Sequence, residues 1–186
     1  SACVCSSDRL MSQGNRGLYD RVRGRLVWPI REVTGDVIGF GARKLYEDDQ
    51  GPKYLNTPET PLYKKSQVLY GIGLAKREIA KNKQVVVVEG YTDVMAMHLS
   101  GVGTAIATCG TASGPEHPRT VRRLPGDVGE TGAVVYTFDG DQAGQQAAMK
   151  AHQQQRVLGV PAYAAVADEW LDPSGLSHRQ EPAPLR

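Results

Sequence analysis

The chain has 186 residues, of which 40% are hydrophobic and 23% charged, which is ordinary for a soluble globular protein. No apolar run approaches the ~20 residues of a membrane-spanning helix, and no charged-then-apolar leader opens the sequence. We therefore expect a cytoplasmic protein with no membrane partner.

Basic side chains are more frequent in the first half of the chain. Residues 1–90 carry 15 basic and 10 acidic side chains, whereas residues 91–186 carry 7 and 10, for a net charge of +2. The asymmetry suits a polyanion bound by the first half and metal ions bound by the second, but it is too small to exclude an ordinary solvated surface. The sparse cysteines and scattered histidines predict neither a disulfide framework nor a zinc site.

Residues 17–31 begin as a basic stretch and continue as a strand. Arg21, Arg23 and Arg25 alternate, so on an extended chain they would project to one side, where guanidinium groups suit phosphate oxygens. A solvated edge strand protected by its charges is an equally good interpretation.

The next segment predicts a β-hairpin. A turn at residues 34–36 leads to a second strand over residues 37–45. Pro29 confines the first strand to a sheet edge or a bulge. Gly39 and Gly41 permit the close approach of another backbone or mark a bulge.

Residues 46–70 are a predicted loop region, because three prolines preclude a long helix. Four tyrosines are interleaved with Lys53, Lys64 and Lys65, a pattern that can stack bases and hold phosphates along a single strand. A loop packed by its own tyrosines is the better interpretation if the segment is considered alone.

From residue 71 onward strands and helices alternate, which predicts an α/β fold with a mainly parallel sheet and helices on its faces. In the first helix, 71–83, we expect Leu74, Ile79 and Ala80 to face inward. The further predicted elements are strand 84–88, helix 93–100, strand 104–109, a helix around 116–124, strand 133–138, helix 143–158 and strand 162–166. Residues 177–186 are expected to form a disordered tail.

An acidic residue follows the first strand of this region. Four consecutive valines at 85–88 predict a strand that is buried on both faces, and Glu89 comes directly after it. Gly90 lets the chain turn, and Thr92 is expected to cap a helix that begins at Asp93.

A second hydrophobic strand ends in Asp139 and Asp141, and the glycine between them lets both carboxylates point the same way. Asp172 follows a third strand. Because the carboxyl ends of parallel strands meet at one sheet edge, we expect Glu89 and these aspartates to bind Mg²⁺ for two-metal phosphoryl transfer. Helix capping is the simple alternative for Asp141, and it is the favoured one for Asp93.

The motifs around these residues carry a family resemblance. Residues 89–93 (EGYTD) and 138–144 (FDGDQAG) resemble the Toprim fold, which bacterial primases, type IA and type II topoisomerases and some nucleases share. Further motifs narrow the resemblance to DnaG-type bacterial replicative primases, namely residues 25–31 (RLVWPIR), 39–43 (GFGAR), 53–60 (KYLNTPET) and 69–71 (LYG).

The resemblance implies synthesis of short RNA primers on a single-stranded DNA template at the replication fork. A primer 3′-hydroxyl would attack the α-phosphate of a ribonucleoside triphosphate, with Mg²⁺ or Mn²⁺ as cofactor. The implied acidic site comprises the catalytic metal ligands Glu89, Asp139 and Asp141, the further ligand Asp172, and Asp93. The implied template and nucleotide surface comprises Arg43, Lys53, Asn56 and Lys65, with Arg21, Arg23 and Arg25. The implied organisation is a partial basic subdomain (1–70), a Toprim domain (71–176, core about 83–170) and the tail.

Two features depart from the family pattern. The third acidic motif, usually Asp-Pro-Asp, reads Asp172-Pro173-Ser174 here, which is one ligand fewer. The family's zinc-binding and helicase-binding domains are not found, so we expect a fragment that contacts the replicative helicase only through a missing domain. A non-catalytic nucleic-acid-binding module and a Toprim nuclease stay as alternatives, whereas no tyrosine has the context of a topoisomerase nucleophile.

Overall fold

The computed structural model describes residues 10–15, 17–108, 121, 132–138 and 161–166. The chain divides into two compact units, Ser1–Lys64 (unit 1) and Lys65–Arg186 (unit 2). The organisation that we expect, with a boundary after residue 70, stays a prediction. The predicted helix 143–158, the tail and all of the predicted helix 116–124 except Val121 lie outside the described residues.

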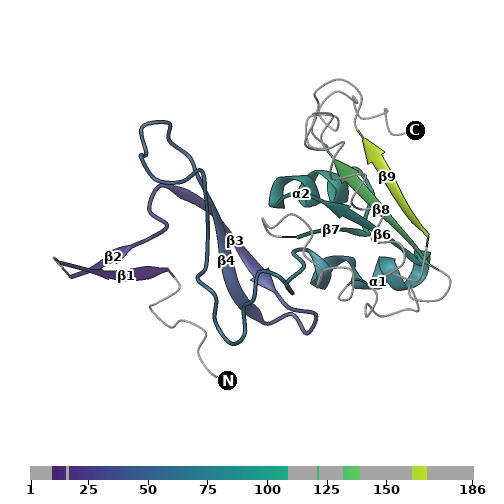
Figure 1. Ribbon diagram of the computed structural model, residues 1–186, viewed down its shortest axis with the longest axis horizontal. Coiled ribbons are helices and arrows are strands. Elements are labelled where there is room, and N and C mark those ends of the chain that lie inside the picture. The colour runs from purple at the N-terminus through teal and green to yellow at the C-terminus, as the bar shows by residue number, and fades with distance from the viewer. Residues whose placement is uncertain (1–9, 16, 109–120, 122–131, 139–160, 167–186) are drawn as a thin grey trace, which may run out of the picture. The chain divides into compact units, whose positions relative to one another are not determined.

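Unit 1 contains two small antiparallel sheets (Figure 1). One pairs β1 (Met11–Gly14) with β2 (Gly17–Asp20), and the other has the order β3-β4-β5, with β3 at Arg25–Arg31, β4 at Val37–Lys44 and β5 at Tyr54–Asn56. Strands β3 and β4 form the expected hairpin. Pro29 lies in β3 at the edge of this sheet, as predicted, because an edge strand tolerates a residue that has no N–H to donate.

A tyrosine ring explains the glycine at position 39. Trp28, Ile30 and Gly39 share one face of the sheet, since Ile30 pairs with Gly39. A Cβ atom built on Gly39 would lie 3.1 Å from Cδ2 of Tyr63, and the side chains of Ile30 and Tyr63 are fully buried. The close neighbour of Gly39 is therefore an aromatic ring and not a second backbone. The alternative of a bulge is supported, because the register of β3 and β4 shifts between Ile30, which pairs with Gly39, and Arg31, which pairs with Val37. The Tyr63 ring completes the small core of unit 1.

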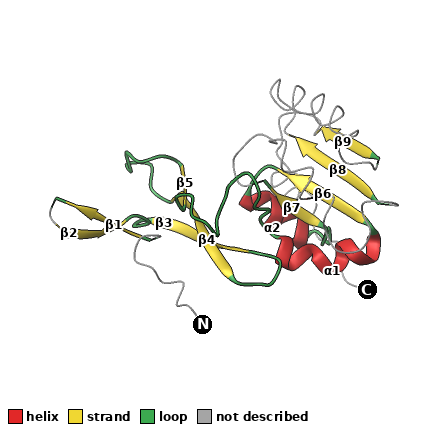
Figure 2. Cartoon of the chain, turned by 60° about the horizontal axis from the view of Figure 1, so that its bottom comes forward, coloured by secondary structure: helices red, strands yellow, loops and turns green. Residues whose placement is uncertain are grey.

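Unit 2 is an α/β structure with a four-stranded parallel sheet, as predicted (Figure 2). The strands are β6 (Gln84–Val88), β7 (Ala105–Ala107), β8 (Ala133–Phe138) and β9 (Ala162–Val166), in the order β7-β6-β8-β9, and the helices are α1 (Ile72–Asn82) and α2 (Tyr91–Leu99). Neither of these helices, which are the ones in the described part of the chain, is long and apolar enough to cross a membrane.

The valines of β6 are buried on both faces of the sheet. Val85 and Val87 pack in one cluster with Ile79 of α1, while Val86 and Val88 pack in another with Val94 of α2. All four valines have exposed fractions of 7% or less. The absence of polar alternation in the sequence thus correctly predicted a strand covered by a helix on each side.

Two predictions about the helices were wrong. Leu74 was expected to face inward, but its side chain is 71% exposed, and Ile72 and Ala75 are buried instead. Helix α2 begins at Tyr91 with Gly90 as its N-cap, so Thr92 is not the cap. The ring of Tyr91 packs edge-on against Tyr70 at a centroid distance of 4.7 Å, a tertiary contact that capping preferences do not take into account.

Candidate metal centre and nucleic-acid interface

The carboxyl ends of β6 and β8 lie side by side in the parallel sheet. Thr137 near the end of β8 donates a hydrogen bond from its hydroxyl to the carbonyl oxygen of Val87 in β6, at 3.3 Å. Glu89 is exposed and follows directly after β6. Phe138 ends β8 and directly precedes Asp139 in the sequence. An exposed carboxylate therefore stands at the sheet edge where parallel α/β sheets bind their ligands.

Asp93 holds the turn that carries Glu89. Its Oδ2 atom accepts a hydrogen bond from the backbone N–H of Gly90 at 2.9 Å, and its side chain lies in the first turn of α2 with the residue 8% exposed. A carboxylate at this position also interacts favourably with the positive end of the helix dipole. The capping role that the sequence favoured for Asp93 is confirmed, and it fixes the backbone next to Glu89.

The remaining acidic candidates, Asp139, Asp141 and Asp172, lie outside the described residues. Within the described ranges, no three histidine, cysteine or acidic side chains come together as a metal-binding group. Glu89 fits a hard cation such as Mg²⁺ because it offers carboxylate oxygens at an accessible sheet edge.

Tyr136 belongs to the core behind this edge. It pairs with Val87 and is 4% exposed, and its burial raises its pKa from 10.0 to about 12. The phenol therefore stays protonated well above neutral pH, as expected for a side chain packed in the sheet interior.

Three predicted surface residues of unit 1 gather around Tyr54. Arg43 and Tyr54 are directly opposite each other on β4 and β5, so they share one face of the sheet, and Asn56 lies two residues further along that face. The guanidinium carbon of Arg43 lies 5.9 Å from the Tyr54 ring centroid, and Nζ of Lys53 lies 5.8 Å from it. These distances suit cation–π contacts on a ring that is 46% exposed.

Tyr54 was not among the predicted site residues. The alternation of Tyr54 and Asn56 along a short strand would have placed both side chains on one face, but the sequence did not reveal that β5 pairs with β4 beside Arg43. Tyr63 is buried, and Tyr70 packs edge-on against Tyr91 of α2, which lies outside the loop. These two tyrosines therefore have packing roles, although Tyr70 does not pack within its own loop.

The expected row of arginines is not formed. Residues 21–24 make a turn, in which the backbone N–H of Arg25 donates to the carbonyl of Val22 at 3.1 Å. Arg23 is exposed and Arg21 partly so, while the Arg25 side chain is 5% exposed and pairs with Asp49. The prediction failed because it required an extended backbone.

The remaining predicted surface residue, Lys65, belongs to unit 2.

Two family models match the chain: the N-terminal domain of the DNA primase catalytic core over residues 3–76, and the Toprim domain over residues 83–165. The chain belongs to the DnaG-type primases. The family and the fold expected from the sequence motifs are thereby confirmed.

The curated relatives include a DNA primase of Streptomyces coelicolor, 60% identical over 167 residues, which are 90% of this chain and 26% of that protein. A DNA primase of Mycobacterium tuberculosis is 54% identical over 95% of this chain and 28% of its own length. This chain therefore spans about a quarter of the length of such relatives.

Solved structures of primases share the fold. The RNA polymerase domain of the M. tuberculosis primase DnaG superposes with a TM-score of 0.85 at 54% identity, covering 93% of this chain and 57% of that one. The E. coli primase catalytic core gives 0.79 at 34% identity, covering 93% and 54%. Related structures contain double-stranded DNA with a 6-nucleotide overhang and single-stranded DNA.

Proposed function

We propose that this chain supplies the metal site and part of the template surface for DNA-templated synthesis of RNA primers. The observation that carries the proposal is the exposed Glu89 at the carboxyl end of β6, beside the end of β8, within a chain that belongs to the DnaG-type primases. Asp139 and Asp141 follow β8 directly in the sequence, so the topology supports a shared site for all three carboxylates.

Glu89, Asp139 and Asp141 are the proposed catalytic metal ligands, and Asp172 is a further ligand. The capping bond of Asp93 to Gly90 orients the backbone that carries Glu89. Bound Mg²⁺, or Mn²⁺ in its place, would lower the pKa of the primer 3′-hydroxyl and neutralise the phosphates of the ribonucleotide. The chain's own part is to hold oxygen ligands in place at an open sheet edge.

The proposed interface for single-stranded DNA and ribonucleotides is centred on Tyr54. Arg43 and Lys53 lie close to its ring and Asn56 is on the same face, so a base could stack near donors for phosphate oxygens. Arg21 and Arg23 are proposed as further members of this surface, and Lys65 of unit 2 is proposed as a separate template-binding residue.

Primer synthesis tests the proposal. The full chain should incorporate labelled ribonucleotides on single-stranded DNA with Mg²⁺ or Mn²⁺, alone or with a zinc-binding primase domain added, and Glu89→Gln should lose this activity. DNA and metal binding without product would favour a non-catalytic binding module. Degradation of the template would favour a nuclease.

Calorimetric titration with Mg²⁺ tests the ligand set separately. Asp139→Asn and Asp141→Asn should each weaken Mg²⁺ binding with little loss of stability, because each removes one charged oxygen ligand. Unchanged titrations would remove these aspartates from the metal site.

A further inference from the structure

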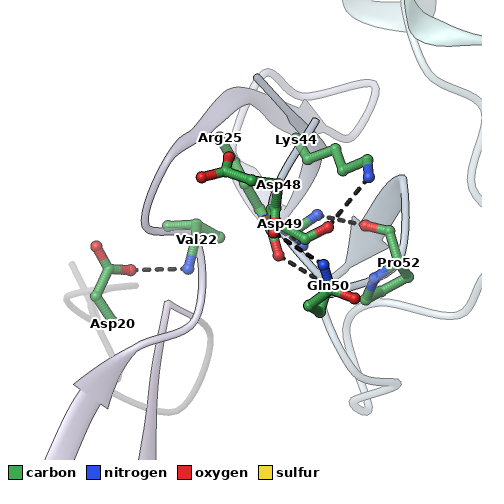
Figure 3. Close-up of polar contacts among 9 residues, drawn as sticks. Asp20, Val22, Arg25, Lys44, Asp48, Asp49, Gln50 and Pro52 are labelled. Carbon is green, nitrogen blue, oxygen red and sulfur yellow. Dashed lines mark hydrogen bonds and ion pairs between the residues drawn. The ribbon is translucent and has the colours of Figure 1, made fainter. Parts of the chain in front are cut away.

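The guanidinium group of Arg25 is turned into unit 1 and bonds to the loop between β4 and β5 (Figure 3). Its Nη2 atom lies 3.1 Å from Oδ2 of Asp49, and its Nη1 atom donates to the carbonyl oxygen of Pro52 at 2.7 Å. Only 5% of the Arg25 side chain is exposed, against 28% for Asp49. One side chain of β3 therefore holds two points of the loop at residues 45–53.

The loop is shaped by the same aspartate. Oδ1 of Asp49 accepts the backbone N–H of Gly51 at 2.7 Å, and the Asp49 carbonyl accepts a hydrogen bond from Nζ of Lys44 at 3.1 Å. A Cβ atom built on Gly51 would lie 2.6 Å from Nη2 of Arg25 and 2.9 Å from Oδ1 of Asp49. The glycine is thus the residue that lets the loop close against the ion pair.

This loop leads directly into the proposed nucleic-acid interface. The backbone N–H of Lys44 donates to the carbonyl of Lys53 at 3.0 Å, and Tyr54 follows as the first residue of β5. A change in the loop path at Asp49 or Pro52 would therefore shift Lys53 and the Tyr54 ring. Such a shift would weaken binding at the interface, because small displacements of binding groups cause large losses of interaction with a ligand.

We propose that Arg25 is a positioning residue for this interface: it acts through Asp49 and the loop, and it does not touch nucleic acid. The proposal rests on the proposed function, because the interface that it positions is the one centred on Tyr54. A phosphate would have to compete with a carboxylate that already pairs with the enclosed guanidinium group, whereas the rigid fork of arginine matches two loop acceptors at once.

The direction of the change in DNA affinity caused by Asp49→Ala distinguishes a positioning role of Arg25 from direct contact of Arg25 with phosphate. If Arg25 positions the loop, Asp49→Ala should weaken binding of single-stranded DNA about tenfold, although it removes a negative charge. If Arg25 contacts phosphate directly, Asp49→Ala should free the guanidinium group and tighten binding. Asp48→Ala is the matched control, since Asp48 is exposed and its loss removes the same charge one residue away; it should leave binding unchanged or slightly tighter.

Substitutions at Arg25 provide a second, independent test. Arg25→Lys keeps the charge but cannot reach Asp49 and Pro52 together, so it should weaken binding about as much as Asp49→Ala. The double variant Arg25→Met with Asp49→Ala should bind DNA no more weakly than either single variant, because both substitutions disrupt the same contact between Arg25 and the loop. Arg31→Met is the charge control, since Arg31 is exposed at the other end of β3 and donates to the Gly35 carbonyl.

Binding can be measured by fluorescence anisotropy on the full chain, with circular dichroism to establish folding. Tighter or unchanged binding by Asp49→Ala, with full retention in Arg25→Lys, would overturn the positioning role while leaving the proposed function intact. If the unaltered chain does not bind DNA, or if Lys53→Ala and Tyr54→Ala bind as it does, the proposed interface itself fails. Should Arg25→Met not fold, Asp49→Ala and Arg25→Lys decide the question.

Discussion

In unit 2 the central strand β6 is covered on both faces by apolar side chains, whereas the three-stranded sheet of unit 1 has its first strand tied to a loop by an ion pair and a carbonyl contact. The first arrangement is stabilised by apolar surface that is removed from water, and this hydrophobic contribution does not depend on the orientation of the side chains. The second depends on specific donor and acceptor geometry. We infer that substitutions in the apolar clusters around β6 mainly lower stability, whereas substitutions in the contacts between Arg25 and the loop mainly change the shape of the nearby surface.

Substitution of Glu89 should have the largest effect on activity, because the Asp93 hydrogen bond fixes the backbone next to Glu89 and the Glu89 side chain is exposed. Glu89→Gln should lower ribonucleotide incorporation on the order of 10³-fold, since a metal ligand contributes several kcal/mol to transition-state stabilisation. The melting temperature should hardly change, because the side chain is exposed outside the apolar clusters. A large loss of stability with retained activity would contradict the separation of site and core.

Ile79 tests the core of unit 2. Ile79→Ala should lower the free energy of unfolding by about 2–5 kcal/mol, because a fully buried side chain is removed from the cluster that contains Val85 and Val87. Leu74→Ala on the same helix is the control, and it should change the free energy by less than about 0.5 kcal/mol since Leu74 is exposed. Denaturant titration distinguishes the two, and equal effects would refute the assigned helix face.

The buried phenol of Tyr136 should make the stability of unit 2 decrease at alkaline pH. Its pKa is raised to about 12 by burial, so the folded state keeps the proton that the unfolded chain releases near pH 10. Stability is therefore fully present below about pH 10 and falls by about 2 kcal/mol as the pH rises toward 12. Denaturant midpoints at several pH values should show this loss, and Tyr136→Phe should reduce it. An equal loss in the variant would assign it to other groups.

The smallest expected effect concerns the surface cations. Changing Lys53 and Lys65 to Ala should weaken DNA binding by about 1 kcal/mol and reduce the slope of log K against log salt by about 1–2, because fewer counterions are released. Lys81→Ala is the control, since Lys81 is an exposed cation on α1 with a side chain that is 74% exposed. An unaltered slope in the double variant would remove both lysines from the residues proposed to bind DNA.

Much of the fold could be predicted because its signals are local. The strands at 84–88, 133–138 and 162–166 lie where apolar runs predicted them, and Pro29 lies at the sheet edge. The side of α1 that faces the sheet was misjudged at Leu74, because both faces of that helix contain apolar residues and only packing against β6 selects between them.

The amino-acid sequence by itself determined the order of α1, β6, α2 and β7 in the described part of unit 2, the burial of the four valines and the position of Glu89 after them, since apolar periodicity and chain order suffice for these. The tertiary structure alone decided that Arg25 turns inward to Asp49, and that Arg43 and Lys53 lie close to the ring of Tyr54. These contacts join residues whose spacing along the chain carries no pattern, so their partners emerge only when strands pair and loops close.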